Sequence, residues 1–316
     1  MQNGKEFNYL ELKVNRDFGD IITVYFEFLK QNIKKFTNIF LSYNGIFLIA
    51  LLIVSYLLVS GFIGMITYAN NAAAVGDLGG DEQYLVYLAI GGILYFVVFI
   101  AVAILNYSLA GSYMIKYEEL KGNHFDKKEV WNLFKNRLGS ILLFIVLLIG
   151  IYIGVSIFGF ILMLIPFLGI FAYYIVLFFI LAWFGVSFFC MLEENKGVTE
   201  AFGEGWNLVY KNFWKSVGVN FVLGFLNGIL VFIVMIIPGV IVGLYTFHVV
   251  ENNVDVEAGI FPTIIYTLGT CLILIVGVYG QCLSQFVNGM LYYALHEKAY
   301  NTNTRSKIAQ IGNSEQ

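Results

Sequence analysis

The chain has 316 residues, of which 59% are apolar, 17% aromatic and only 12% charged. Soluble domains average about 45–50% apolar and about 25% charged residues, so this composition indicates a membrane protein whose main partner is the lipid bilayer. Lys and Arg total 18 against 21 Asp and Glu, and the resulting net charge of −3 excludes a general basic field for nucleic acid.

The N-terminal segment, residues 1–43, carries charged side chains ahead of the first apolar run. It lacks the short apolar core and small-residue cleavage site of a secretory signal, so we expect it to stay in the mature protein. Apolar side chains recur on one face at helical spacing: Phe18, Ile21, Ile22, Tyr25, Leu29, Phe36 and Phe40. This pattern predicts a cytoplasmic amphipathic helix that lies in the membrane interface.

Six apolar stretches follow, and each can cross a bilayer as a helix. A span needs about 20 apolar residues, and irregular backbone cannot satisfy its polar groups in lipid. The predicted spans cover about residues 45–68, 85–112, 140–164, 167–191, 217–245 and 261–294, within a transmembrane domain over 44–295. The predicted fold is all-α, a polytopic transmembrane helix bundle with six spans arranged as three hairpins, each preceded by an amphipathic interfacial helix.

Proline and glycine punctuate two of these stretches. Pro166 with Gly169 marks a tight turn between the third and fourth spans. Pro238 with Gly239 should kink or end the fifth span, because proline has no amide hydrogen to donate.

Basic residues give the orientation, because cytoplasmic loops collect Lys and Arg. All 18 lie in the N-terminal segment, in the connections between spans two and three and between spans four and five, and in the C-terminal tail. The opposite connections hold none. We therefore expect a multi-pass protein of the bacterial cytoplasmic (inner) membrane, with both termini in the cytoplasm and a disordered tail over residues 296–316.

Similar segments precede the three hairpins, which indicates an internal repeat. Residues 26–32 (FEFLKQN) align without a gap with residues 206–212 (WNLVYKN), and residues 131–136 (WNLFKN) form a third copy with one residue deleted. The alternative is that these segments are cytoplasmic extensions of the spans. The interfacial motif, whose tryptophans are typical of the membrane–water boundary, comprises Trp131, Trp206, Asn212, Trp214 and Pro238.

The third copy carries a longer pattern of aromatic, glycine and proline residues: Glu200-Ala201-Phe202, Trp206, Leu208, Lys211-Asn212-Phe213-Trp214, Gly218 and Ile237-Pro238-Gly239. This pattern resembles that of bacterial six-span proteins catalogued with the membrane domain of glycerophosphoryl diester phosphodiesterases. The match is close over about residues 199–240, and the six-span layout agrees over nearly the whole chain. The resemblance implies a polytopic inner-membrane protein. It does not imply phosphodiesterase chemistry, which belongs to a separate soluble domain for which we expect no room here.

The sequence offers few groups for chemistry. The predicted spans contain no Asp, Glu, Lys or Arg, which argues against a proton- or sodium-coupled transporter. His124, His248 and His296 are far apart in sequence, and the three cysteines lie in apolar stretches, so we expect neither a metal site nor a disulfide. We predict no catalytic residues, no cofactor and no enzymatic activity.

Polar side chains within the spans are the remaining candidates for a site. They are Gln281, Ser284, Gln285 and Asn288, which share one face of the predicted helix 261–294, together with Asn106, Ser112, Asn220 and Asn227. One interpretation is a polar cavity that opens toward the cytoplasm. The other, which we favour, is hydrogen bonding between helices, worth about 0.6 kcal/mol per contact.

Two functional hypotheses remain. The leading one is a non-enzymatic membrane protein with a scaffold, assembly or envelope-lipid organising role, whose partners are other membrane proteins or further copies of itself. Glycine pairs such as Gly150 and Gly154, one helical turn apart, allow the close helix approach that such association needs. The alternative is a channel or exporter for a neutral or amphiphilic small molecule that uses the polar face of residues 281–288.

Overall fold

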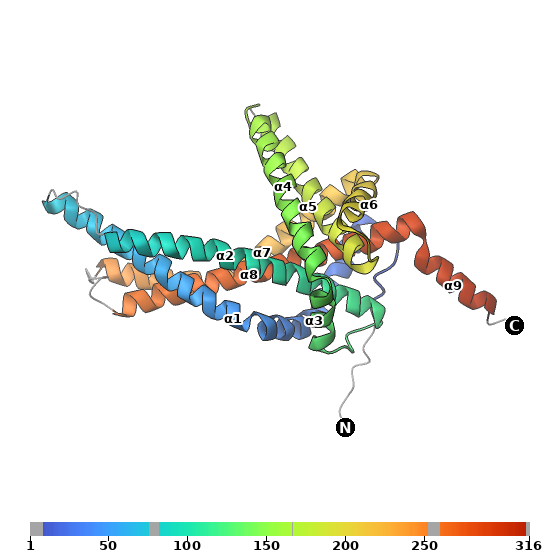
Figure 1. The fold of residues 1–316 in the computed structure, drawn as a ribbon, viewed down its shortest axis with the longest axis horizontal. Coiled ribbons are helices and arrows are strands. Elements are labelled where there is room, and N and C mark those ends of the chain that lie inside the picture. The colour runs from blue at the N-terminus through green and yellow to red at the C-terminus, as the bar shows by residue number, and fades with distance from the viewer. Residues whose placement is uncertain (1–8, 76–81, 166, 252–259, 314–316) are drawn as a thin grey trace, which may run out of the picture. The chain divides into compact units, whose positions relative to one another are not determined.

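The computed structural model describes residues 9–75, 82–165, 167–251 and 260–313. Within these ranges the regular structure is entirely helical, and six helices are long and apolar enough to cross a membrane (Figure 1). The prediction of an all-α polytopic bundle is therefore confirmed. Pro166 and the acidic residues Asp77, Asp81, Asp255 and Glu257 of the connections lie outside the described residues.

The helix bounds in chain order are α1 Phe18–Val75, α2 Glu82–Glu119, α3 Lys127–Asn136, α4 Leu138–Met163, α5 Leu168–Glu193, α6 Val198–Tyr210, α7 Phe213–Glu251, α8 Ile260–Tyr300 and α9 Thr302–Asn313. The six candidate spans are α1, α2, α4, α5, α7 and α8, and each coincides with one predicted apolar stretch. Helices α1, α2, α7 and α8 are much longer than the roughly 20 residues that one crossing needs.

The three repeat copies do not fold alike at the junction with their spans. The first copy lies in α1, which continues without a break into the first span, as in the alternative in which the segment is an extension of the span. The other two copies form the separate helices α3 and α6. The φ and ψ angles of Arg137, −107° and 5°, leave the helical region between α3 and α4, whereas no residue between Phe18 and Asn44 interrupts α1.

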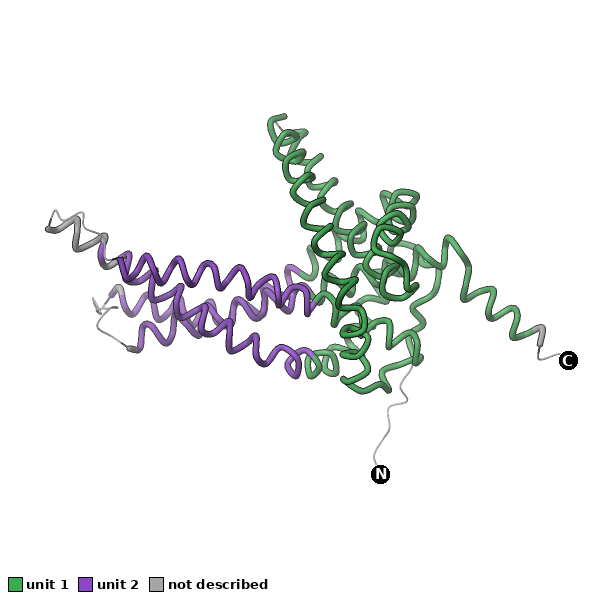
Figure 2. Tube along the Cα trace, viewed as in Figure 1, with its two compact units in different colours: residues 1–39, 107–227, 282–316 green, residues 40–106, 228–281 purple. Residues whose placement is uncertain are grey.

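The chain divides into two compact units (Figure 2). Unit 1 comprises residues 1–39, 107–227 and 282–316, and unit 2 comprises residues 40–106 and 228–281. Helices α1, α2, α7 and α8 each contribute a stretch to both units, while α3, α4, α5, α6 and α9 belong wholly to unit 1.

Unit 2 is held by close packing of apolar helices. A Cβ added at Gly61 of α1 would lie 2.7 Å from Leu88 Cγ of α2, and one added at Gly269 of α8 would lie 2.3 Å from Val242 Cγ2 of α7. Small residues at such positions let helix backbones approach closely, which is how apolar helices gain contact in lipid. Glycines therefore fix the helix spacing in this unit.

Unit 1 has an aromatic core around α4, α5 and α6. The rings of Phe144 and Phe202 stack with centroids 4.5 Å apart, and Trp183 Nε1 donates a hydrogen bond to Phe202 O at 2.8 Å. At the turn between α4 and α5, a Cβ at Gly169 would lie only 1.9 Å from Leu162 O, so only glycine fits there. This close approach explains the glycine of the predicted tight turn.

Of the two outcomes predicted at Pro238, a kink or an end of the helix, the structure excludes the end, because α7 runs through Pro238 to Glu251. Proline removes one amide donor from the helix. Membrane helices tolerate this loss because neighbouring helices and small local adjustments satisfy the backbone group that is left without a partner.

The tail is not disordered over residues 302–313, which form α9. The Glu297 carboxylate accepts hydrogen bonds from the amides of Asn303 and Thr304, both at 3.0 Å, and so satisfies first-turn donors that would otherwise lack partners.

Candidate functional site

Several carboxylates of unit 1 belong to a polar cluster that ties the N-terminal segment to the ends of α2, α5 and α8. We call this cluster the ionic network and define it by five carboxylates, Glu118, Glu193, Glu194, Glu204 and Glu297, and by the groups bound to them. Its members come from segments far apart in the sequence, and all belong to unit 1.

Glu118, at the end of α2, is deeply buried, with 2% of its surface exposed. One carboxylate oxygen accepts hydrogen bonds from the Tyr9 hydroxyl at 2.6 Å and the Leu12 amide at 3.3 Å, and the other pairs with Lys121 Nζ at 2.6 Å. Burial raises the pKa of Tyr9, and the hydrogen bond to the Glu118 carboxylate raises it further. Tyr9 therefore acts as a neutral donor that fixes the N-terminal segment to α2.

Glu193 and Glu194, at the end of α5, hold two lysines. Lys13 Nζ lies 2.6 Å from Glu193 Oε1, and Lys196 Nζ lies 2.8 Å from Glu194 Oε2. Burial lowers the pKa of each lysine, but the adjacent carboxylates outweigh it, and both pKa values end above the ordinary value. Both lysines are therefore charged at neutral pH.

The remaining contacts of Glu194 reach α8. Its Oε1 accepts a hydrogen bond from the Tyr292 hydroxyl at 2.9 Å and lies 3.5 Å from His296 Nε2. These contacts join the α5–α6 connection to the end of α8.

Helix α9 is attached through Glu11. Lys307 Nζ lies 2.6 Å from Glu11 Oε1, and Asn303 Nδ2 donates to the same oxygen at 2.7 Å. Burial alone would raise the pKa of Glu11, but the Lys307 and Asn303 hydrogen bonds lower it below its ordinary value. The network thus reaches from the N-terminal segment to the C-terminal helix.

Chemically, the ionic network binds its own members. Each of its five carboxylates accepts a hydrogen bond or an ion pair from a described side chain or amide. Charge-assisted hydrogen bonds are stronger than neutral ones, so these contacts fix the positions of the segments that they join. The sequence analysis used these charges only to predict orientation and missed the network. Acids and tyrosines just beyond the span ends are visible in the sequence, but the sequence does not indicate which of these residues bind each other.

The predicted polar-cavity residues are divided between the two units. Gln281 and Asn106 belong to unit 2, whereas Ser112, Asn220, Asn227, Ser284, Gln285 and Asn288 belong to unit 1. In unit 2, Asn106 Oδ1 accepts a hydrogen bond from Asn44 Nδ2 at 2.8 Å, a contact between α2 and α1. This pair is of the interhelical kind that the favoured interpretation describes.

In unit 1 the predicted polar residues form separate contacts. Asn288 Nδ2 donates to Gln285 Oε1 at 3.4 Å, and both side chains are buried. Asn227 Oδ1 accepts from the Tyr25 hydroxyl at 2.6 Å, linking α7 to α1. Ser284 is exposed, so it does not join its buried helix neighbours.

Glycine makes room for the buried amides. A Cβ at Gly185 would lie 2.0 Å from Asn288 Cγ, and one at Gly111 would lie 3.5 Å from Gln285 Nε2. The Asn288 amide thus fills space that a side chain at position 185 would need, whereas the distance at Gly111 is an ordinary van der Waals contact. Two polar atoms of these amides, Gln285 Nε2 and Asn288 Oδ1, are buried and make no hydrogen bond with a described residue, and the same holds for Ser112 Oγ of α2.

The interfacial motif residues differ in exposure. Trp206 is 40% exposed and Trp214 73%, whereas Pro238 is buried within α7 and Trp131 packs on Phe134 with ring centroids 5.0 Å apart. Trp206 stacks on Tyr210, itself 62% exposed, with centroids 5.9 Å apart. Helix α6 therefore presents an aromatic face formed by Trp206 and Tyr210.

The same side-chain hydrogen bond occurs within two of the repeat copies. Asn212 Nδ2 donates to Leu208 O at 2.9 Å, and Asn32, its counterpart in the first copy, donates to Phe28 O at 3.0 Å. Phe28 and Leu208 are both buried. The aligned positions thus play the same local role in α1 and at the end of α6.

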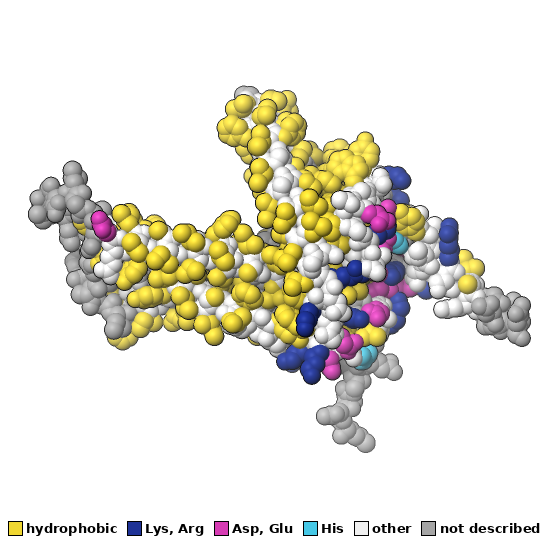
Figure 3. Space-filling model, viewed as in Figure 1, with side chains coloured by type: hydrophobic (Ala, Val, Ile, Leu, Met, Phe, Trp, Pro, Cys, Tyr) yellow, Lys and Arg dark blue, Asp and Glu magenta, His cyan; other side chains and the backbone are white. Residues whose placement is uncertain are grey.

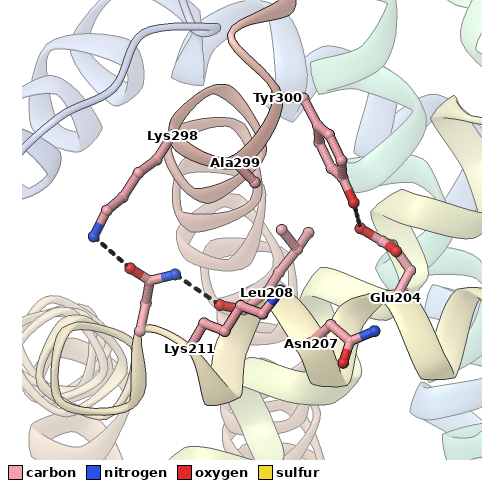
Figure 4. A pocket seen from close by; sticks show the side chains of 8 residues that line it. Glu204, Asn207, Leu208, Lys211, Lys298, Ala299 and Tyr300 are labelled. Carbon is pink, nitrogen blue, oxygen red and sulfur yellow. Dashed lines mark hydrogen bonds between the residues drawn. The ribbon is translucent and has the colours of Figure 1, made fainter.

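A polar pocket of about 300 Å³ lies between α6 and the end of α8 (Figure 4). Its lining comprises Glu204, Asn207, Leu208, Lys211, Asn212, Lys298, Ala299 and Tyr300. Figure 4 shows Lys298 on one side and Tyr300 with Glu204 on the other. Lys298 Nζ donates to Asn212 Oδ1 at 2.7 Å, and the Tyr300 hydroxyl donates to Glu204 Oε1.

Among the described residues, no group of three or more His, Cys, Asp or Glu side chains is arranged to hold a metal ion. The cysteines Cys190, Cys271 and Cys282 are buried, and none of the three is joined in a disulfide. Comparison of the chain with protein-family models, with curated proteins and with solved structures gives no match.

Proposed function

We propose that this chain is a non-enzymatic protein of the bacterial cytoplasmic membrane that organises lipid or membrane assemblies through the polar surface of unit 1, with both termini in the cytoplasm. The observation that carries the proposal is the charge distribution. All 18 Lys and Arg residues fall in the segments of unit 1, where the buried carboxylates are engaged in holding the chain together. Such a surface is suited to contact with headgroups or partners at the membrane face.

Helix α6 supports a position at the membrane–water boundary. Its aromatic face, Trp206 and Tyr210, is exposed, and its polar residues Glu204, Asn207 and Lys211 lie on another face at helical spacing. Tryptophan and tyrosine concentrate at the headgroup level, with polar groups toward water. The resemblance to six-span inner-membrane proteins of the glycerophosphoryl diester phosphodiesterase membrane-domain family agrees with this placement.

Extraction of the full chain from its own membrane into polymer-bounded nanodiscs, followed by mass spectrometry of lipids and co-purified proteins, tests the proposal. We expect one lipid class or one membrane protein to be enriched relative to bulk membrane. Replacing Trp206, Tyr210 and Trp214 together by Ala should remove the enrichment. The control replaces Phe225 and Phe232, which are exposed aromatics of α7. No enrichment from the parent chain would contradict the proposal.

Orientation has its own test. A reporter fused after Gln316 and cysteine labelling at introduced sites in the connections should place both termini and the basic connections in the cytoplasm. A periplasmic reporter signal would contradict the charge-based topology.

A channel or exporter for a neutral or amphiphilic small molecule is the second candidate. Buried polar atoms without a partner are costly in a low-dielectric interior, and Gln285 Nε2 and Asn288 Oδ1, which belong to amides beside Gly111 and Gly185, are two such atoms. A polar solute would supply their partners. This candidate predicts that Gln281→Leu with Gln285→Leu abolishes flux in reconstituted vesicles at unchanged expression. Equal flux in this variant, or no flux in the parent, removes it.

A further inference from the structure

We infer that the pocket between α6 and the end of α8 binds a phosphate group, carried by a lipid headgroup or free in the cytoplasm. The inference deepens the proposed lipid-organising function and rests on it for the position of the pocket at the membrane face.

The two lysines that line the pocket, Lys211 and Lys298, differ from the lysines of unit 1 that form ion pairs. Lys13, Lys116, Lys121, Lys196 and Lys307 each lie 2.6–2.8 Å from a carboxylate oxygen. Lys298 donates to the neutral Asn212 amide, and Lys211 Nζ makes no hydrogen bond or ion pair with a described residue. The pocket therefore presents two cations that no carboxylate of the described chain neutralises.

The acidic residue of the lining does not cancel this charge. Glu204 Oε1 accepts the Tyr300 hydroxyl, and Glu204 Oε2 lies 3.8 Å from Lys196 Nζ. Tyr300 and Glu204 stand on the side of the pocket away from Lys298 (Figure 4). The Glu204 charge is thus shared with a lysine outside the pocket, and the Lys298 side remains positive.

The available donors suit a phosphate. Lysine ammonium groups carry three donors each, and Lys298 uses one of them on Asn212. The exposed amide of Asn207 makes no hydrogen bond with a described residue. Charge-assisted hydrogen bonds from two lysines and one amide are a common way to hold phosphate oxygens.

The pocket's size and position limit the ligand further. A volume of about 300 Å³ is at the small end for ligand sites, enough for a headgroup phosphate but not for a whole lipid. The pocket belongs to the polar face of α6, and the aromatic face of Trp206 and Tyr210 occupies another side of the same helix. A headgroup at the boundary can reach this polar face.

The test is lysine-acylation footprinting of the full chain in a phosphate-free detergent. Three probes are compared: inorganic phosphate, dioctanoyl phosphatidic acid, and dioctanoylglycerol, which has the same tails and no phosphate. We expect phosphate or phosphatidic acid to slow acylation of Lys211 and Lys298 and to leave Lys128 unchanged, an exposed lysine of α3. Protection by both phosphate probes assigns the site to the phosphate itself, and protection by phosphatidic acid alone assigns it to a lipid headgroup.

Variants give a second measure. Lys211→Ala and Lys298→Ala should each weaken probe binding about tenfold, as expected for one charge-assisted contact, while Lys128→Ala leaves it unchanged. Lys211→Arg should retain binding. If a variant fails to fold, footprinting of the native chain still decides the question.

No protection by either phosphate probe, or equal protection by dioctanoylglycerol, would overturn the site. The two proposals fail separately. Protection of Lys211 without any enriched lipid or partner in nanodiscs leaves the site and removes the lipid-organising function, whereas enrichment without protection does the reverse.

Discussion

Four continuous helices contribute to both unit 1 and unit 2, but different interactions stabilise the interior of each unit. All 18 Lys and Arg residues fall in unit 1 segments, while the charged residues described in unit 2 are Glu82 and Glu251. Figure 3 shows the charged side chains gathered over unit 1 and a largely apolar face on unit 2. Helix α8 contributes to both units, and nearly every residue of its unit 1 stretch from Cys282 to Leu295 is buried.

Stretches of the same helix are therefore stabilised in different ways in the two units. Lipid tails are as apolar as leucine, so unit 2 gains little from hiding apolar side chains and depends on close packing at small residues. Unit 1 combines buried aromatic rings with an ionic network, in which loss of one partner leaves a buried group unsatisfied. Equivalent substitutions should therefore cost more in unit 1.

The largest effect is expected where α6 lies against α5. A Cβ at Gly205 would lie 2.8 Å from the backbone of Ser187, which cannot move aside like a side chain. Gly205→Leu should therefore lower the stability of unit 1 by about 3 kcal/mol or more. Gly203→Leu, on an open face of the same helix, should be neutral or stabilising by about 1 kcal/mol. Thermal unfolding in detergent compares them, and equal melting temperatures would contradict the packing.

Next in size is the loss of Glu118. Glu118→Ala leaves the Tyr9 hydroxyl, the Leu12 amide and Lys121 without their acceptor, and we expect a loss of about 2–3 kcal/mol. Its neighbour Glu119 pairs with Lys116 on the surface and is 55% exposed. Glu119→Ala should cost at most about 0.5 kcal/mol. Similar melting temperatures for the two variants would show that the ionic network does not hold the N-terminal segment.

The sequence was sufficient for the spans because their signal is local. About 20 apolar residues without charge define a crossing whatever the neighbours are, so all six predicted stretches coincide with long helices. The tight turn at Gly169 was likewise local. The continuation of α7 through Pro238 was not, because it depends on the packing around the proline.

The ionic network could not be predicted in the same way. The hydrogen bond between Tyr9 and Glu118 joins residues 109 positions apart in the sequence, and the one between Asn303 and Glu11 joins residues 292 positions apart. Composition records these residues but not their pairing. The α9 helix was missed for this reason, since its first-turn amides depend on Glu297 of α8. The polar pocket was missed for the same reason, because its lining comes from both α6 and α8. Two of its lining residues, Lys211 and Asn212, belong to the aromatic, glycine and proline pattern of the third repeat copy.

A smaller effect is expected from the polar pair of unit 2. Asn44→Ala removes the 2.8 Å hydrogen bond to Asn106 between α1 and α2. Such bonds within membrane helices average about 0.6 kcal/mol, because the separated helices also find partners. Gln31→Ala, an exposed position of α1, serves as the control. A loss as large as that of Glu118→Ala, measured by the same thermal unfolding, would remove the contrast between the units.

The smallest effect concerns pH and the attachment of α9. The pKa of Glu11 is lowered in the folded chain, so its ion pair stabilises fully above the ordinary value of 4.5 and is lost as pH falls through the lowered pKa. Because Lys307 is 55% exposed and Glu11 32%, the contribution is at most about 1 kcal/mol. A spin label at Ile308→Cys should become more mobile on acidification below pH 4.5. With Glu11→Gln the label should be more mobile at neutral pH, and any remaining pH response then comes from other groups, such as the Glu297 carboxylate at the start of α9.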